Sequence, residues 1–236
     1  MIAVWKREVQ SYFFTSVGYV FMGVFLALTG VMFFVQNISA QDSNVLLMLS
    51  QITFLWMLLS PVLTMRLLAE ERNRKTDQLL LTSPVSLWGV VTGKFLAAAT
   101  VLAVTVLLTI GYVLVIAVYG KVYLGEVMVG YLGFILQGCC FLALDLYISG
   151  CVKSQVTAVV AAFGVNLALW LLDVLVTAVA VPLVTPVLNF LSLYDRYEPF
   201  LLGQLSFSSI LYYLTFCAVF IALTVRMLDA RRWREG

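Results

Sequence analysis

Between residues 101 and 118 the chain reads Val101-Leu-Ala-Val-Thr-Val-Leu-Leu-Thr-Ile-Gly-Tyr-Val-Leu-Val-Ile-Ala-Val118, a run of 18 residues without a charged side chain. A bilayer offers the backbone no hydrogen-bond partners, so such a run crosses it as a helix or as a strand of a closed barrel. Barrel strands alternate apolar and polar residues, and this run does not. It is therefore expected to form a transmembrane helix.

The whole chain has the composition of a membrane protein. Hydrophobic residues make up 63% of its 236 residues and charged residues only 11%, and the mean hydropathy is +1.04. These values exclude an ordinary soluble domain. Because one span takes about 20 residues, six spans leave no segment for a separate soluble domain. Residues 1–236 are thus expected to form one all-α membrane domain, with transmembrane helices at about Val17 to Val35, Val45 to Leu68, Gly93 to Val118, Val127 to Ile148, Val156 to Val181 and Ser209 to Leu228.

The first residues, about 1–16, are expected to form a short helix in the membrane interface. Lys6 and Arg7 interrupt the apolar pattern and no small-residue cleavage site follows, so a cleavable signal peptide is not expected. The alternative is a frayed, partly ordered terminus. The interfacial helix is favoured because residues recur at helical spacing opposite the polar ones, namely Ile2, Trp5, Val9, Tyr12, Phe13 and Ser16.

The basic residues predict the orientation. With both termini in the cytoplasm, 12 of the 14 lysines and arginines lie on the cytoplasmic side, and only Lys121 and Arg196 lie outside. Positive charge gathers in cytoplasmic loops of membrane proteins. We therefore expect a multi-pass protein of the cytoplasmic membrane, surrounded by the lipid bilayer, with no nucleic-acid partner.

Several kinds of chemistry have no candidate residues in this chain. It has no histidine, and its four cysteines lack the spacing of metal ligands, so no metal site is predicted. Thr92-Gly93-Lys94 lacks the first glycine of a phosphate-binding loop. The chain is therefore expected to be non-catalytic and to hold no cofactor of its own.

Charged residues are densest in the loop between the second and third predicted spans, residues 66–85. Thr76 suits the N-cap of a short helix, Asp77 suits its positive end, and Pro84 ends it after about two turns. Leu79 to Leu81 give it an apolar surface. So short a helix is not stable alone in water, which points to a partner surface. The alternative is an amphipathic loop on the membrane face.

Residues of this loop resemble a known family signature. Ala69-Glu70-Glu71, Thr76, Leu79-Leu80-Leu81-Thr82-Ser83-Pro84-Val85 and Gly93-Lys94 are similar to the pattern of ABC-2-type permeases. Lys75 and Gln78 stand where that family usually has glycine and an acidic residue. The resemblance implies that about residues 69–88 form a cytoplasmic coupling helix that docks on an ATPase, with contacts from Glu70, Glu71, Arg74, Thr76, Asp77, Gln78, Leu79, Leu80, Leu81 and Pro84.

A second stretch is similar to the permeases of the gliding-motility-associated and nitrous-oxide-reductase-maturation group. It runs from Ser192 to Gly203 and continues in Leu211-Tyr-Tyr-Leu. The resemblance implies a second permease, identical or homologous, and two copies of an ABC ATPase that bind ATP and Mg²⁺. It also implies a membrane-anchored extracytoplasmic auxiliary subunit. Proline and glycine break the segment at about 182–208, which is expected to be an external re-entrant segment before the last helix.

Polar residues inside the predicted spans are candidates for function, since burying them in lipid is costly. Asp145 lies near the cytoplasmic end of the fourth helix, where it is expected to reach interfacial water or to pair with Lys153. Pro61 is expected to kink the second helix, as a bending point or as a static kink. One face of the fifth helix predicts a polar pathway, a seam between permeases or interhelical hydrogen bonds, with Asn166, Trp170, Asp173 and Thr177.

Three functions remain open at this point. The first is a permease that moves an unidentified substrate with energy from a separate ATPase. The second is the same fold transmitting ATP-driven motion to an extracytoplasmic auxiliary protein without moving solute. The third is a secondary transporter or an ATP-independent membrane enzyme, against which stand the lack of an inverted repeat and of a catalytic acid cluster.

Overall fold

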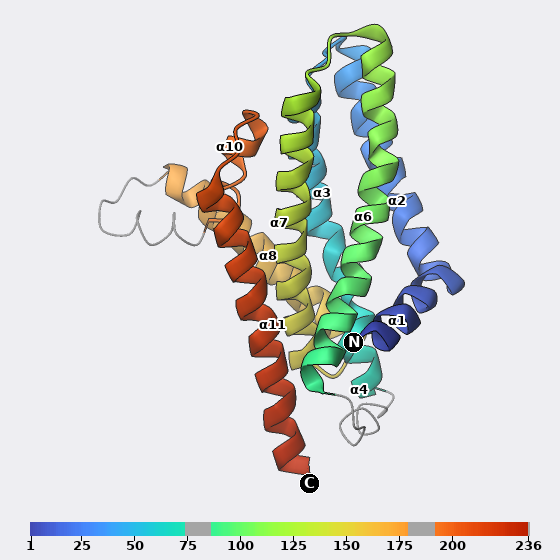
Figure 1. The fold of residues 1–236 in the computed structure, drawn as a ribbon, viewed down its shortest axis with the longest axis vertical. Helices are drawn as coiled ribbons and strands as arrows, with labels where there is room; N and C mark the ends of the chain where they lie inside the picture. Colours follow the sequence, from blue (N-terminus) through green and yellow to red (C-terminus); the bar gives the residue numbers. More distant parts are fainter. Residues whose placement is uncertain (74–85, 179–191, 236) are drawn as a thin grey trace.

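The computed structural model describes residues 1–73, 86–178 and 192–235, and these form a bundle of helices (Figure 1). No strand occurs in these three ranges. Six helical segments are long and apolar enough to cross a membrane, which confirms the six predicted spans. They are Ser16–Ser39, Val45–Asn73, Leu87–Tyr119, Leu124–Cys151, Gln155–Leu172 and Phe207–Arg232.

The spans are built from the following elements. The first is α2 (Ser16–Phe33) with the π-helical turn η1 (Phe34–Ser39). The second joins α3 (Val45–Met65), the π-helical turn η2 (Arg66–Glu70) and α4 (Glu71–Asn73). The others are α6 (Leu87–Tyr119), α7 (Leu124–Cys151), α8 (Gln155–Ala178) and α11 (Phe207–Glu235). Two short helices, α1 (Ile2–Phe14) and α10 (Glu198–Leu201), complete the described chain.

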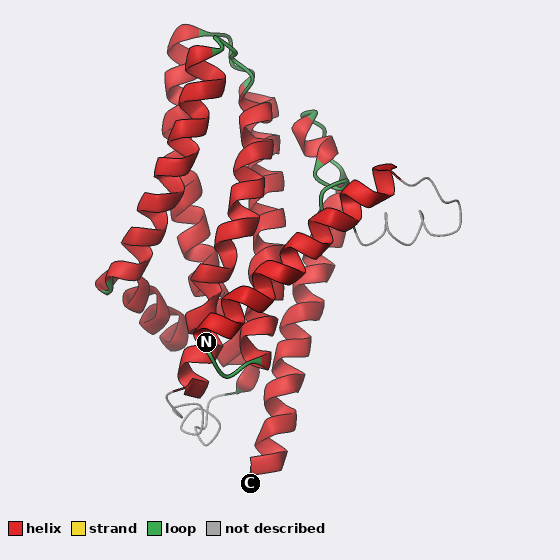
Figure 2. Cartoon of the chain, turned by 180° about the vertical axis from the view of Figure 1, so that it is seen from behind, coloured by secondary structure: helices red, strands yellow, loops and turns green. Residues whose placement is uncertain are grey.

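α7 forms the centre of the bundle. In its most apolar stretch 67% of the residues are buried, whereas in the corresponding stretch of α8 only 17% are buried. α3 packs beside α7, and the indole of Trp56 on α3 meets the rings of Phe25 and Phe134 edge to face, at 5.6 and 6.2 Å between centroids. α8 slants across the bundle and ends at the grey segment in Figure 2. Several of its described exposed side chains are large and apolar, among them Val156, Val160 and Leu171, as expected for a helix that faces lipid or another membrane protein.

Two helices extend beyond the apolar runs that predicted them. α6 begins at Leu87, six residues before the expected start at Gly93, because the Ser86 hydroxyl accepts a hydrogen bond from the Gly89 amide at 3.2 Å and caps it. α11 continues to Glu235, seven residues beyond Leu228. Hydropathy marks the part of a helix that lies in lipid, and helices continue into water where caps and charged residues support them.

The N-terminus, α4 and the C-terminal end of α11 lie toward one end of the bundle, at the bottom of Figure 1. α1 lies across the lower parts of α2, α3 and α6 there, and the extended residue Thr15 turns the chain into α2. A helix was predicted over about residues 1–16, and it forms over Ile2–Phe14. The opposite end carries the connections from α2 to α3 and from α6 to α7.

The described part of the predicted re-entrant segment, from Ser192 to Ser206, packs against α7 and α11. The Tyr197 hydroxyl donates to the Gly130 carbonyl at 3.3 Å, and the Tyr213 hydroxyl donates to the Leu193 carbonyl at 2.8 Å. Phe200 is fully buried against Gly133. The ring of Tyr212 lies under the Arg196 guanidinium, 4.2 Å from its carbon to the ring centroid.

Candidate functional site

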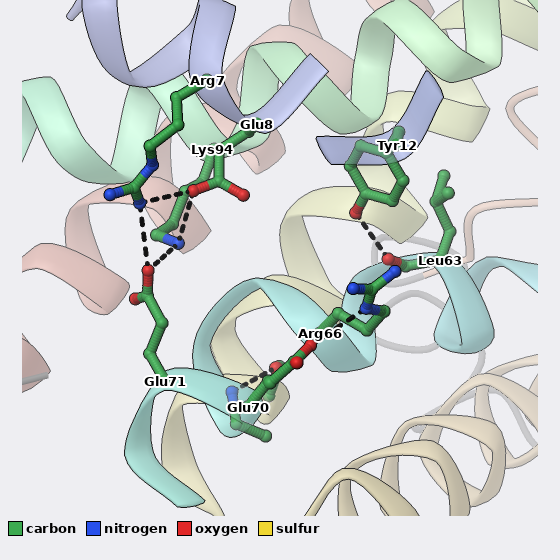
Figure 3. Close-up of polar contacts among 10 residues, drawn as sticks. Arg7, Glu8, Tyr12, Leu63, Arg66, Glu70, Glu71 and Lys94 are labelled. Carbon is green, nitrogen blue, oxygen red and sulfur yellow. Dashed lines mark hydrogen bonds and ion pairs between the residues drawn. The ribbon is translucent and has the colours of Figure 1, made fainter. Parts of the chain in front are cut away.

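Four charged side chains meet at the end of the bundle that carries the N-terminus (Figure 3). Lys94 Nζ of α6 lies 2.7 Å from Glu71 Oε1 of α4 and 3.3 Å from Glu8 Oε1 of α1. Arg7 Nη2 of α1 lies 2.7 Å from Glu8 Oε1 and 3.3 Å from Glu71 Oε1. Two cations and two carboxylates therefore alternate, and we call these four residues the ionic clamp.

Three of the four side chains of the ionic clamp are largely buried. The Lys94 side chain is 1% exposed, and those of Glu8 and Glu71 are 13% and 17% exposed. Surface ion pairs contribute little to stability, but removing one partner of a buried pair costs about 3–5 kcal/mol because it leaves a buried charge uncompensated. Lys94 is thus the most buried of the four side chains, and the loss of its charge should cost the most stability. Arg7, at 61% exposed, lies at the rim.

Glu8 is ionised in this arrangement. Burial of its carboxyl opposes ionisation, but the positive charges of Lys94 and Arg7 and their hydrogen bonds outweigh that effect and hold the pKa of Glu8 below its ordinary value. The Glu8 carboxylate therefore keeps its charge near neutral pH.

A glycine on α6 allows α1 to approach Lys94. A Cβ added at Gly93 would lie 3.0 Å from Val4 Cβ and 3.1 Å from the Met1 carbonyl oxygen, both tighter than ordinary contacts. Next to this contact, the Trp5 indole N–H donates to Thr100 Oγ1 at 3.0 Å. Gly93 and Lys94 thus act together in this fold, because Gly93 allows the close approach of α1 and Lys94 forms an ion pair with it.

Two further contacts, the first of them drawn in Figure 3, tie α1 and its connection to α2 onto the end of α3 and the turn η2. The Tyr12 hydroxyl donates to the Leu63 carbonyl at 2.7 Å. Arg66 pairs with Glu70 at 2.9 Å between Nε and Oε2, and its Nη1 donates to Thr15 Oγ1 at 3.4 Å. α1 is therefore held by α3, α4 and α6 together.

The end of α7 binds the same region from the other side. The Ser149 hydroxyl donates to the Met65 carbonyl at 3.3 Å and accepts from the Ala69 amide at 3.2 Å, which satisfies backbone groups of the π-helical turn η2. Arg72 Nη1 donates to the Cys151 carbonyl at 3.1 Å. These bonds hold η2 and α4 against the end of α7, where Glu71 meets Lys94.

A second polar cluster lies inside the bundle. The Ser60 hydroxyl of α3 donates to Asp145 Oδ2 of α7 at 2.6 Å, and Asn166 Nδ2 of α8 donates to Asp145 Oδ1 at 3.0 Å. All three side chains are fully buried. Asn166 Nδ2 also lies 3.3 Å from the Met57 carbonyl, the group that Pro61 leaves without its helical donor. One carboxylate and one amide therefore join three helices.

No group of three metal-ligating His, Cys, Asp or Glu residues occurs within the ranges that the structure describes. Both polar clusters are built for hydrogen bonds and ion pairs between helices. They can hold helices in a fixed relation to one another and pass a displacement from one helix to the next.

Comparison with known families bears on what those helices do. The model of a family described as ABC-2 family transporter protein matches residues 26–232. The chain belongs to the ABC-2 transporter family. It is the multi-pass, non-catalytic permease subunit of an ABC transporter, and permeases of this family work with an ABC ATPase as partner. A comparison with curated proteins finds no match for this sequence.

The match to the ABC-2 family begins inside α2 and leaves out α1. Glu71 and Lys94 of the ionic clamp lie inside the matched residues, and Arg7 and Glu8 lie before them. The clamp therefore joins the matched part of this ABC-2 permease to a helix that lies before the matched residues.

Two of the residues predicted to couple this permease to an ATPase lie in described elements. Glu70 pairs with Arg66, and Glu71 belongs to the ionic clamp. The rest of the predicted set lies outside the described residues, namely Arg74, Thr76, Asp77, Gln78, Leu79, Leu80, Leu81 and Pro84. The sequence analysis did not identify Arg7, Glu8 and Lys94 as partners of Glu71. A lysine within an apolar helix was the one available signal for this site.

The predicted stripe on the fifth span is partly described. Asn166 faces the bundle interior and bonds to α3 and α7, and the partly buried ring of Trp170 packs on Phe54 at 5.3 Å between centroids. The side chains of Asp173 and Thr177 lie outside the described residues. A role of the stripe in a pathway or in a seam between permeases stays a prediction.

The expectation that Asp145 reaches interfacial water or pairs with Lys153 is wrong. Asp145 is fully buried, and both of its oxygens accept hydrogen bonds from side chains of neighbouring helices. The reason is that the π-helical turn and α4 lengthen the second span, so that α7 continues beside it past Asp145 to Cys151.

Proposed function

We propose that residues 74–85 dock on an ABC ATPase subunit and that the ionic clamp passes the resulting displacement to α1, α3 and α6. ATP and Mg²⁺ bind on the ATPase in this scheme, and the permease binds neither. The observation that carries the proposal is the buried Lys94, which joins the two ends of the docking segment to each other and to α1.

Chain connectivity supports the first step. Glu71 lies three residues before the docking segment, and α6 begins two residues after it. Both ends of the segment therefore continue directly into membrane-spanning helices, so a force on the segment acts on α3 and α6 without an intervening flexible linker. Rigid elements that end at a moving contact are the usual means by which a local event becomes a movement of helices.

The clamp supports the second step. Without the Lys94 pairs, α3 and α6 would meet at this end mainly through apolar contacts that allow sliding. Buried pairs at 2.7 and 3.3 Å have one preferred geometry, so the ends of the two helices move as one. α1 moves with them, because Glu8, Tyr12 and Thr15 bind the same ends.

The sidedness of the protein belongs to the same proposal. The end that carries the N-terminus, α4 and the C-terminal end of α11 faces the cytoplasm, since 12 of the 14 basic residues lie on that side of a six-span topology. The resemblance to the gliding-motility-associated group supports a complex of two permeases, two ATPases and an extracytoplasmic auxiliary subunit in the cytoplasmic membrane. The substrate is unidentified.

The substitution Leu80→Asp tests docking. It places a charge on the apolar surface of the docking segment, and we expect membrane insertion to persist while co-purification of the ATPase and ATP hydrolysis by the complex fall at least tenfold. Leu80→Met is the matched control, because it keeps the apolar surface and should leave both unchanged. Normal assembly and hydrolysis in Leu80→Asp would remove the docking role from residues 74–85.

A further inference from the structure

The ends of the first span and of α6 lie at the end of the bundle opposite the N-terminus (Figure 1), and residues of both line one cavity. Its volume is about 570 Å³, within the range of sites that hold small molecules. Phe33, Val115 and Ile116 form apolar walls, and Asn37, Asp42 and Tyr119 are polar groups around them. The two spans end at Ser39 and Tyr119, so the cavity lies at the boundary between membrane and water.

Asn37 is the residue that marks the cavity as a site. It lies in the π-helical turn η1, a local geometry that often occurs at functional positions. Its side chain is 8% exposed, and its Nδ2 donates to the Asp42 carbonyl at 2.8 Å. Its Oδ1, however, has no hydrogen-bond partner among the described residues. A buried acceptor without a donor is costly, and a ligand with an N–H or O–H group would satisfy it.

The charged residues near Asn37 indicate which charges a ligand in the cavity would carry. The Asp42 carboxylate lines the cavity, and one of its oxygens accepts from the Asn44 amide at 3.0 Å. A second hollow of about 320 Å³ shares Asp42 and Ser43 with the cavity and is lined by Lys121 and Glu126. Lys121 forms no ion pair with any residue in the described ranges. Asp42 thus lies on the edge that the two hollows share, and Lys121 lines the second hollow together with Glu126.

We propose that this cavity binds the headgroup of a zwitterionic amphiphile of the phosphatidylethanolamine type. The ammonium group donates to Asn37 Oδ1 and pairs with Asp42, and the phosphate is attracted to Lys121 across the shared edge. The hydrocarbon chain follows the apolar wall of Val115 and Ile116 into the bilayer. The proposal depends on contacts at this end of the bundle alone, so it stands or fails independently of docking at residues 74–85.

Three lipid headgroups differ in the hydrogen-bond donors and charges that they offer to Asn37 and Asp42. Phosphatidylethanolamine carries both the N–H donors and the positive charge. Phosphatidylcholine carries the charge without an N–H donor, so it leaves Asn37 Oδ1 unsatisfied. Phosphatidylglycerol carries O–H donors for Asn37 Oδ1 but no positive charge for Asp42. We therefore expect phosphatidylethanolamine to bind about tenfold more tightly than either of the other two lipids, since each of them lacks one part of the charge-assisted hydrogen bond.

The test uses the purified full-length chain in detergent, exchanged against each of the three lipids, with native mass spectrometry to count retained lipid. Asp42→Asn should reduce the preference for phosphatidylethanolamine over phosphatidylglycerol about tenfold, and Lys121→Gln should reduce retention of both. Glu126→Gln removes a negative charge near the phosphate and should increase retention. Asp195→Asn is the matched control, because Asp195 is an exposed acid that lines neither hollow.

Two results would overturn the proposal. One is equal retention of the three lipids by the unmodified chain, and the other is an Asp42→Asn variant that behaves like Asp195→Asn. Soluble phosphoethanolamine, which has the same headgroup and no chains, distinguishes the two sources of this chemistry. Its failure to displace bound lipid at millimolar concentration supports an amphiphile, and full displacement at that concentration refutes it.

Discussion

Replacing Lys94 with methionine removes one charge from the ionic clamp and keeps most of the side-chain volume. Glu8 and Glu71 then lose pairs at 3.3 and 2.7 Å and keep their pairs with Arg7, at 2.7 and 3.3 Å. Removing one partner of a buried ion pair costs about 3–5 kcal/mol. Because Arg7 remains and both carboxylates retain some exposure, we expect the lower end of this range, about 3 kcal/mol.

The loss should appear in thermal unfolding. For a domain of this size 1 kcal/mol corresponds to about 2–4 °C in Tm, so Lys94→Met should lower Tm by roughly 6–12 °C in detergent. Lys121→Met is the matched control, since Lys121 is exposed and forms no ion pair within the described chain. Its effect should stay within about 0.5 kcal/mol.

A double-mutant cycle separates the pairing from a general effect of the lysine. Glu71→Gln in the Lys94→Met background removes the carboxylate that the first change deprived of its lysine partner. The double variant should therefore lose less stability than the two single variants lose together, by a coupling free energy of at least about 1 kcal/mol. A Lys94→Met shift no larger than that of Lys121→Met, or full additivity with Glu71→Gln, would refute the idea that the clamp holds α4 to α6.

Three further predictions follow from particular contacts. The pKa of Glu8 is lowered in the folded chain, so its stabilising effect is fully present above about pH 4.3, the ordinary glutamate value, and is lost as the pH falls through the lower folded value. Thermal unfolding followed against pH should therefore show an acid loss that Glu8→Gln abolishes, and an unchanged profile would contradict it. Asp145→Asn should cost less than about 1 kcal/mol because the amide keeps hydrogen bonds to Ser60 and Asn166. Asp145→Leu removes the acceptor that both groups share, leaves them the longer bonds to the Met57 carbonyl at 3.5 and 3.3 Å, and should cost about 3 kcal/mol in the same assay. Gly133→Ala should destabilise the protein by about 1–3 kcal/mol, since its Cβ would lie 2.6 Å from Phe200 Cβ, while Gly111→Ala meets nothing within 4 Å and should be neutral or stabilising.

The spans were predictable from the sequence because hydropathy alone decides whether a segment lies in lipid. Each of the six predicted helices overlaps a helix of the structure over most of its length. The ends were less predictable. Lys94 interrupts the apolar run of α6, so the pattern placed the start of the helix beside it, whereas the Ser86 cap extends the helix to Leu87. A cap depends on backbone geometry that a hydropathy pattern does not contain.

The candidate site was only half predictable for a similar reason. The sequence resemblance identified Glu71 because it lies in a local motif. Its partners Arg7 and Glu8 lie more than 60 residues away in the chain, and Lys94 lies 23 residues beyond it. These distances close only when α1 folds back across α6, which Gly93 permits. A single sequence reports spacing within a helix well, but it does not report which helices will touch.

The two polar clusters act on α3 at different depths, and this has a mechanical consequence. Ser60 and the Met57 carbonyl bind α7 and α8 inside the bundle, while Glu71 binds α1 and α6 at its end. Pro61 lies between the two attachments, where the helix already lacks one backbone hydrogen bond. The part after Pro61 is also bonded to α7, through Ser149 and Arg72. A displacement that enters at Glu71 should therefore strain these bonds, bend α3 near Pro61 and leave the part before Pro61 fixed to α7. Restoring the missing donor with Pro61→Ala should stiffen this point, so spin labels placed at Arg72 and Tyr147 should show a narrower distance distribution than in the unmodified permease. An unchanged distribution would mean that α3 moves as one rigid rod.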